Sequence, residues 1–254
     1  MGGLIGDMDK IVGGTYDPVR AARRQPGYWR GVWEHTKMTY PVSMDRMYTS
    51  TEPACMAVKA AEQQSEDVAR CVLRRLREAT FVFGRPADDL ERIVEAVRGV
   101  AGLDIDRLAE DFASEPVAKT FREDWDETRH PNEYVMTLDE DVPGNGRAKH
   151  TEGHWRFVFP TVIFRGPDGE VTVPGWKDYG RYVDAIETVA PGTTSDPRPG
   201  PSVAQVFETW GTASATELEF LTGTADPPDG VVPIDTDEWR FFLVPAEAAA
   251  RGIE

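Results

Sequence analysis

Residues 153–176 contain the pattern that most restricts how this chain can fold. An apolar run of aromatic and β-branched residues extends from Phe157 to Phe164, with Pro160 in its middle, and a Gly-Pro-Asp-Gly turn separates it from a second run, Val171 to Val173. Two such runs around a turn predict a β-hairpin, and a proline in a strand pattern is confined to an edge or to the start of a strand. We therefore predict that Pro160 opens the first strand and that a helix follows from Lys177 to Val189.

The residues before this hairpin predict a block of amphipathic helices. Thr51 and Ser65 can each cap a helix, and Ser65 precedes a stripe of apolar residues at helical spacing. A break at Gln63–Ser65 is therefore expected between two helices. Further helices are predicted at 88–100, 105–113 and 115–129. Residues 130–152 are polar and interrupted by Pro and Gly, which predicts a long loop leading to the Pro160 strand.

A linker and a small appendage are predicted at the end of the chain. Residues 191–201 have the Pro, Gly, Ser and Thr composition of a linker. Residues 202–254 predict two helices and a hairpin, an arrangement that resembles a winged helix; Ser214 and Glu217 form a capping-box pattern before the second helix. Ten acidic residues against two arginines make duplex nucleic acid a poor ligand. We expect the appendage to pack against the rest of the chain or against a partner protein.

The charge of the chain excludes several classes of partner. The formal net charge is −16, and only six of the 28 basic residues are Lys. Such a surface repels nucleic acid and anionic membranes. It suits a cytoplasm of very high salt, so we favour a halophilic origin over an ordinary acidic protein. No apolar run is long enough to span a membrane and no secretory signal is visible, which predicts a cytoplasmic protein. The oligomeric state stays open, with a homo-oligomer among the alternatives.

Six stretches together carry a resemblance to a known family. They are Gly2–Ile5, PACMAVKAAEQQ at 53–64, LRRLREATFVFGR at 73–85, LDIDRLAEDFASEPV at 103–117, FPTVIF at 159–164 and the closing helix from Trp176. In their order and spacing they resemble the DsbA family of the thioredoxin superfamily, in particular its FrnE-like branch of predicted dithiol–disulfide isomerases. The resemblance implies an α/β, thioredoxin-like (DsbA-type) domain at 1–190 with an inserted helical subdomain at about 18–130, followed by the linker 191–201 and a small α+β appendage at 202–254.

The redox motif of that family is absent from the sequence. The family's centre is a CxxC at the start of the first thioredoxin helix, but this sequence holds only two cysteines, Cys55 and Cys71. The resemblance places the motif upstream of Met1, so we expect the domain to be N-terminally incomplete. Either the true protein is longer, which we favour because losing a central strand and helix would expose the core, or the catalytic segment has been lost.

The resemblance also implies a substrate-binding segment. It places Phe159, Pro160 and Thr161 where the family holds the substrate cysteine, and we expect the Phe159–Pro160 peptide bond to be cis. Cys55 is a weaker candidate for a reactive thiol: a first helical turn lowers a thiol pKa, but a buried structural cysteine is the simpler interpretation. Cys55 and Cys71 would lie ~24 Å apart on one continuous helix, far beyond the ~7 Å limit for a disulfide, and only a sharp turn at Gln64–Ser65 could bring them together.

These patterns leave three hypotheses for function. The first is a thiol–disulfide oxidoreductase or isomerase of the DsbA family, redox-inactive as given because it lacks the CxxC. The second is a non-catalytic protein that binds its ligand in the groove beside Pro160, and the third is a glutathione-dependent enzyme like 2-hydroxychromene-2-carboxylate isomerase. The expected partner is a protein or a small thiol or disulfide substrate. No cofactor is predicted, and His150 and His154, outside any helical pattern, are not predicted to bind a metal.

Overall fold

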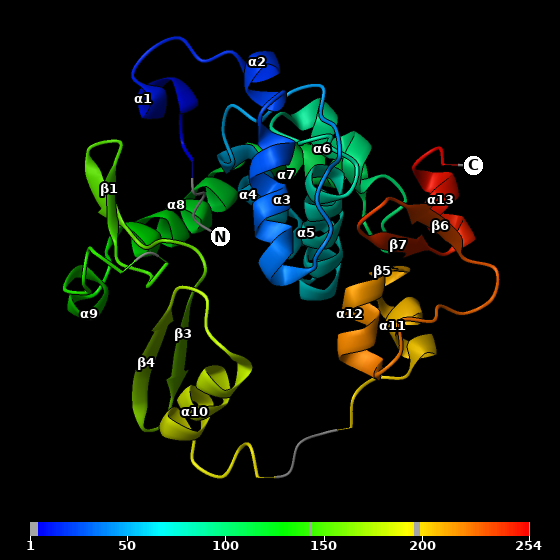
Figure 1. Ribbon diagram of the computed structural model, residues 1–254. Helices are drawn as coiled ribbons and strands as arrows, with labels where there is room; N and C mark the ends of the chain where they lie inside the picture. Colours follow the sequence, from blue (N-terminus) through cyan, green and yellow to red (C-terminus); the bar gives the residue numbers. More distant parts are fainter. Residues whose placement is uncertain (1–4, 143, 196–198, 254) are drawn as a thin grey trace. The chain divides into compact units, whose positions relative to one another are not determined.

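The computed structural model describes residues 5–142, 144–195 and 199–253 (Figure 1). The chain divides into two compact units, which are described separately. One contains the residues up to 121 together with those from 200 onward, and the other contains residues 122–199. The boundary lies within helix α8 (Glu115–Arg129). The described residues form helices and small antiparallel sheets of two, two and three strands, which is consistent with an α/β chain.

The first unit is built around a block of helices. They are α1 (Met8–Val12), α2 (Pro18–Ala22), α3 (Gln25–Thr36), α4 (Glu52–Glu62), α5 (Glu66–Phe81), α6 (Leu90–Val97) and α7 (Ile105–Phe112). The predicted break between α4 and α5 is confirmed, and the Ser65 side chain accepts a hydrogen bond from the Val68 amide at the start of α5. The predicted helix at 88–100 is shorter than expected, because Asp89 caps it and Arg98 leaves the helical conformation.

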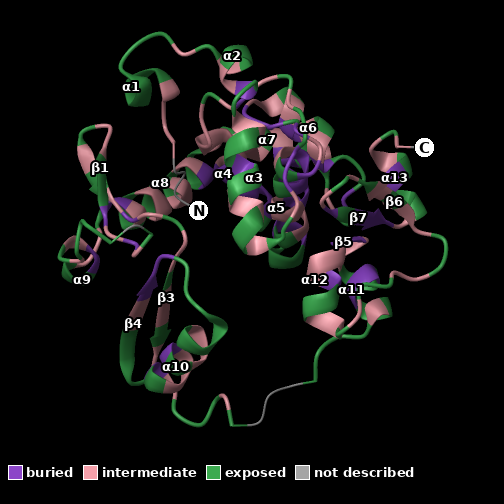
Figure 2. Ribbon diagram, in the orientation of Figure 1, coloured by how far each residue is buried: buried purple, intermediate pink, exposed green. Residues whose placement is uncertain are grey.

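Apolar side chains of α4 to α7 and of the start of α8 form the largest core of this unit. Figure 2 shows much of α5 as buried. The fully buried members include Val72, Ile93, Val97, Leu108 and Val117, which come from four helices spread over 45 residues of sequence. Burying a side chain of this size stabilises the fold by about 1.5–3 kcal/mol. The apolar stripe predicted after Ser65 lies on α5 and therefore faces this core.

The C-terminal residues form helices and a three-stranded sheet. The elements are α11 (Val203–Trp210), β5 (Thr212–Ser214), α12 (Ala215–Thr222), β6 (Val232–Asp235), β7 (Arg240–Leu243) and α13 (Pro245–Ala250). The strand order is β5-β7-β6, and the predicted hairpin is confirmed as the β6–β7 pair. The Ser214 hydroxyl accepts a hydrogen bond from the Glu217 amide, and Gly223 ends α12 in the left-handed conformation.

This C-terminal sheet packs against the helices of the first unit. Trp239, Phe241 and Leu243 share one buried cluster with Trp29 of α3 and with Tyr40. Phe83 meets Phe241 edge-on, with ring centroids 6.4 Å apart. The appendage therefore lies on the helical block, one of the two placements that its acidic composition had suggested.

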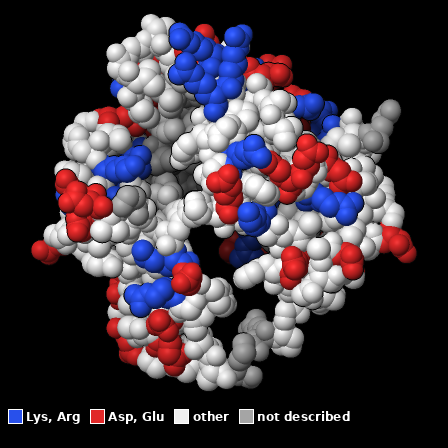
Figure 3. Space-filling view, in the orientation of Figure 1, with Lys and Arg blue, Asp and Glu red and all other residues white. Residues whose placement is uncertain are grey.

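Charged groups of both signs are interspersed over the visible surface (Figure 3). Basic side chains gather over α2, where Arg20, Arg23 and Arg24 are exposed. Among the described residues, no helix combines the length and the apolar character needed to cross a membrane.

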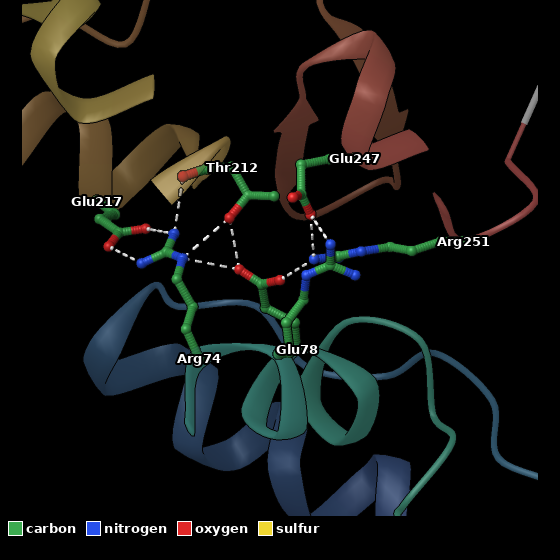
Figure 4. Close-up of polar contacts among 7 residues, drawn as sticks. Arg74, Glu78, Thr212, Glu217, Glu247 and Arg251 are labelled. Carbon is green, nitrogen blue, oxygen red and sulfur yellow. Dashed lines mark hydrogen bonds and ion pairs between the residues drawn. The ribbon is translucent and has the colours of Figure 1, made fainter. Parts of the chain in front are cut away.

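A buried ionic network joins α5 to the C-terminal residues (Figure 4). Arg74 donates hydrogen bonds to both carboxylate oxygens of Glu217, at 2.8 and 2.9 Å, and to Thr212. Glu78 accepts a hydrogen bond from Thr212 through one oxygen and from Arg251 through the other, each at 2.6 Å. Burial alone would lower the pKa of Arg74, but the hydrogen bonds and charges of Glu217 and Glu78 outweigh it and raise that pKa.

The described residues of the second unit form the end of α8, two further helices and two short hairpins. After α8 come α9 (Glu133–Met136), β1 (Lys149–Thr151), β2 (His154–Arg156), β3 (Thr161–Gly166), β4 (Gly169–Pro174) and α10 (Tyr179–Val189). The β3–β4 hairpin is confirmed, with Thr161 opposite Pro174 and Gly166 opposite Gly169. Pro160 directly precedes β3, which agrees with the prediction that this proline opens the strand. One detail of the prediction was wrong, because residues 149–156 form a hairpin of their own.

Candidate functional site

Hydrogen bonds fix the segment around Pro160 in the second unit. The Phe159–Pro160 peptide bond is cis, and Thr161 begins β3 directly after it. The Gly175 amide donates to the Pro160 carbonyl at 2.9 Å, and the Thr161 hydroxyl donates to the Val158 carbonyl at 2.6 Å. The backbone is thus held on both sides of the proline, while the Phe159 side chain remains 51% exposed.

A close approach of three glycines brings the preceding loop to this segment. Gly175 has a φ of 72°, and a Cβ added there would lie 2.3 Å from the Gly144 carbonyl oxygen. A Cβ on Gly146 would lie 2.4 Å from the Gly175 amide nitrogen. Only glycine fits such a contact at a positive φ. Gly144 and Gly146 of the 130–152 loop therefore lie against the glycine that donates to the Pro160 carbonyl.

A small core holds this loop in place. Val135, Ala148 and Phe157 are buried together, with Ile163 of β3 packed against them. The Ala148 amide donates to the Val135 carbonyl, at 3.0 Å. Residues 130–152 were predicted as a long loop. Their described part contains ordered structure, because Val135 of α9 and Ala148, directly before β1, are both buried in this core.

Exposed apolar side chains and an open strand edge meet at Pro160. Phe159, Val162 and Trp176 are 51%, 36% and 47% exposed, and Trp176 follows the glycine that bonds the Pro160 carbonyl. Among the described residues, β3 pairs with β4 alone, so its other edge has no partner strand. An open edge flanked by apolar side chains is a surface to which an extended peptide can add as a strand.

A basic cluster joins the end of α8 to the β1–β2 hairpin of this unit. The Arg129 guanidinium is stacked 4.0 Å from the Trp125 ring and donates through Nε to Nε2 of His154, at 3.1 Å. Burial, and then the positive charge of Arg129, lower the pKa of His154. A neutral His154 is required for this hydrogen bond, because the protonated ring has no lone pair to accept it.

Neither cysteine has the surroundings of a reactive thiol. Cys55, in α4, is 6% exposed, and Cys71, in α5, is half-buried; both belong to the first unit and neither is in a disulfide. Burial raises the pKa of Cys71, and the charges of Glu247 and Asp67 raise it further. Within the described ranges, no group of three or more His, Cys, Asp or Glu side chains is placed to hold a metal ion.

The residues around the Pro160 segment were only partly found from the sequence. Phe159, Pro160 and Thr161 were predicted as site residues, whereas Gly146, Gly175 and Trp176 were not. A signal was present in the sequence, since the tripeptide Val-Pro-Gly occurs twice, at 142–144 and 173–175, and the last residues of the two copies, Gly144 and Gly175, lie in contact.

Comparison with known proteins supports one superfamily. A family model described as Thioredoxin matches residues 11–132, just under half of the chain. The match supports membership of the thioredoxin superfamily. Curated proteins give no match. The matched region covers α2 to α8, and it supports a thiol–disulfide oxidoreductase type of family.

Proposed function

We propose that this chain is a DsbA-type member of the thioredoxin superfamily that holds an extended polypeptide segment at Phe159–Thr161. The main observation behind the proposal is the structure around Pro160. There a hydrogen-bonded backbone, an open strand edge and exposed apolar side chains meet. The thioredoxin match over residues 11–132 supports the family, and the ordered sequence motifs support the DsbA branch.

The chemistry around Pro160 suits a peptide rather than a small polar ligand. Backbone N–H and C=O groups on the free edge of β3 can pair with an extended chain whatever its sequence. Phe159 and Trp176 then contact apolar side chains of the bound segment and select for them. The substrate class is therefore an unfolded or flexible protein segment with apolar residues, including segments that carry cysteine in the manner of the family.

We propose further that the cysteines of this chain perform no disulfide exchange. The thiolate is the attacking species in exchange, and its population falls as the thiol pKa rises. Cys71 has a raised pKa and Cys55 is buried. Binding at Phe159–Thr161 is then the activity of these 254 residues by themselves.

A peptide-binding measurement tests the first part of the proposal. Reduced and carboxymethylated insulin B chain, labelled with a fluorophore, is a suitable probe because it is extended, apolar and unable to exchange disulfides. We expect Phe159→Ala and Trp176→Ala each to weaken binding by about fivefold or more, since an interface contact of this kind contributes about 1 kcal/mol.

The matched control is Phe220→Ala, which removes an aromatic side chain that is 74% exposed on α12 of the other unit. It should leave the affinity unchanged. The proposal fails if all three variants bind the peptide as the parent chain does.

An insulin-reduction assay with dithiothreitol tests the second part. We expect no acceleration over dithiothreitol alone. Acceleration that disappears in Cys55→Ser would show that Cys55 is a reactive thiol and would overturn this part, while leaving the peptide measurement intact.

A further inference from the structure

We propose that a cavity on the first unit binds a small organic phosphate. The cavity has a volume of about 640 Å³ and lies among α5, the residues after it, α6 and the end of the chain. Its lining includes six arginines but only two acidic residues, Asp45 and Glu95. The arginines are Arg46, Arg75, Arg85, Arg92, Arg98 and Arg251.

This grouping runs against the composition of the chain. Acidic residues outnumber basic ones by 44 to 28 overall, yet the cavity lining reverses that ratio. A concave surface lined by one sign of charge concentrates the field and attracts ligands of the opposite sign. The cavity is therefore a local anion-attracting surface on a protein whose overall charge is strongly negative.

The carboxylates that pair with these arginines do not line the cavity. Arg46 forms an ion pair with Asp88 at 2.9 Å, and Arg75 and Arg251 pair with Glu247 at 2.6 and 3.0 Å. None of these carboxylates is among the lining residues, so the lining presents N–H groups in preference to oxygen atoms.

Two arginines of the cavity have no counter-ion in the described part of the chain. Arg85 and Arg98 are exposed, and neither side chain forms an ion pair with any residue that the structure describes. Their positive charges are available to a ligand without the loss of an existing contact.

Deeper in the lining, several guanidinium nitrogens lack an acceptor. Nη1 of Arg75 and both Nε and Nη1 of Arg251 are buried and donate no hydrogen bond. The Arg75 residue is 5% exposed. Buried charged donors are nearly always hydrogen-bonded, so several orphaned ones at one cavity indicate a missing acceptor. Burial, followed by the charge of Arg251, lowers the pKa of Arg75, which agrees with an excess of positive charge here.

The arrangement favours phosphate over other acceptors. Guanidinium groups bind carboxylate and phosphate through paired hydrogen bonds, and a tetrahedral phosphate can accept from several arginines at once. Phe83, Pro86, Ala96 and Ile253 add apolar surface to the lining, and the volume exceeds that of an inorganic ion. Both features suit a phosphate ester with a compact carbon framework. The Arg251 side chain is 11% exposed, and its Nη2 is held by Glu78 and Glu247 while its Nε and Nη1 have no protein acceptor.

Titration of the full chain with sodium pyrophosphate tests this site. Calorimetry and thermal unfolding are run at constant ionic strength, held with sodium chloride. We expect saturable binding and a rise in Tm, because a ligand that binds only the folded state stabilises it. Hydrogen exchange should show added protection in residues 83–98 and 248–253.

The variant Arg85→Gln/Arg98→Gln separates specific binding from a general salt effect. Both side chains are exposed, so the fold should be retained, and we expect at least about a tenfold loss of pyrophosphate affinity. Arg77→Gln is the matched control, because Arg77 is an exposed arginine of α5 that does not line this cavity. It should bind as the parent chain does.

Three results would overturn the proposal. They are a response to pyrophosphate no larger than that to sodium chloride, equal losses in the double variant and in Arg77→Gln, and tighter binding of citrate than of pyrophosphate. The last would show a carboxylate site instead. None of these outcomes depends on peptide binding at Phe159–Thr161.

Discussion

Replacing Arg74 by Met should weaken the attachment of the C-terminal residues to α5. Arg74 donates four hydrogen bonds, two to Glu217 and two to Thr212, and it lies 2.9 Å from the Glu78 carboxylate (Figure 4). Methionine keeps most of the apolar length of the side chain, so the loss is confined to the charge and its hydrogen bonds.

The magnitude follows from how far these groups are buried. The side chains of Arg74, Glu78 and Glu217 are 18%, 7% and 22% exposed. Removing one partner of a fully buried ion pair costs about 3–5 kcal/mol, and exposure of about a fifth reduces that. We expect Arg74→Met to lower the free energy of unfolding of the first unit by about 3 kcal/mol.

Hydrogen exchange is the appropriate assay because a chain with two units need not unfold in one step. The protection of amides in β5 and α12 reports on the contact directly. Arg70→Met is the matched control: Arg70 lies one turn earlier on α5, is 58% exposed and pairs with Glu66, so its loss should cost less than about 0.5 kcal/mol.

A double-mutant cycle isolates the Arg74–Glu217 pair. Arg74→Met and Glu217→Gln, measured singly and together, should give a coupling energy of about 1.5 kcal/mol or more. If Arg74→Met and Arg70→Met change the protection of β5 and α12 equally, the network contributes no more than a surface ion pair and the reasoning is refuted.

Three further predictions follow from single contacts. Gly175→Ala should destabilise the second unit by about 2 kcal/mol or more in urea unfolding, because the φ of Gly175 is positive and an added Cβ would meet a carbonyl oxygen. The control is Gly180→Ala in α10, where the added Cβ has open space, and it should stabilise the unit by about 0.5–1 kcal/mol. The pKa of His154 is lowered in the folded state, so the unfolded chain binds more protons below about pH 6.5 and stability should fall as the pH falls through that value. His154→Gln should flatten this slope in a pH series of Tm values. Cys71 should react with iodoacetamide at pH 8 more slowly in the folded chain than in urea, since its pKa is raised; equal rates would contradict its burial.

Local sequence signals predicted the features that depend on neighbouring residues. Ser65 separated α4 from α5, Ser214 began α12, and the turn at 166–169 closed the β3–β4 hairpin. In each case the side-chain or backbone contacts join residues a few positions apart, so the pattern is complete within a short window.

The candidate site required contacts that no short window contains. Gly146 and Gly175 meet across 29 positions, and their tight approach depends on the path of the whole loop. The role of Phe157 also depends on residues outside its own neighbourhood, since it packs against Val135 and Ala148 and lies outside β3. Apolar character alone does not tell a strand residue from one that anchors a loop.

The burial of the ionic network around Arg74 and Glu78 also could not be predicted from a short stretch of sequence. In the sequence, Arg74 and Glu78 are four residues apart, the spacing of an ordinary ion pair on a solvated helix face. In the structure Glu78 is buried because residues from Thr212 to Arg251 cover that face. If the C-terminal residues were removed, the charged groups of the network would be hydrated again. Trp29, which packs against the same C-terminal sheet, would instead expose apolar surface to water. The attachment is therefore driven by the apolar cluster, and the network determines which segments can occupy that face, because any substitute must satisfy its buried charges.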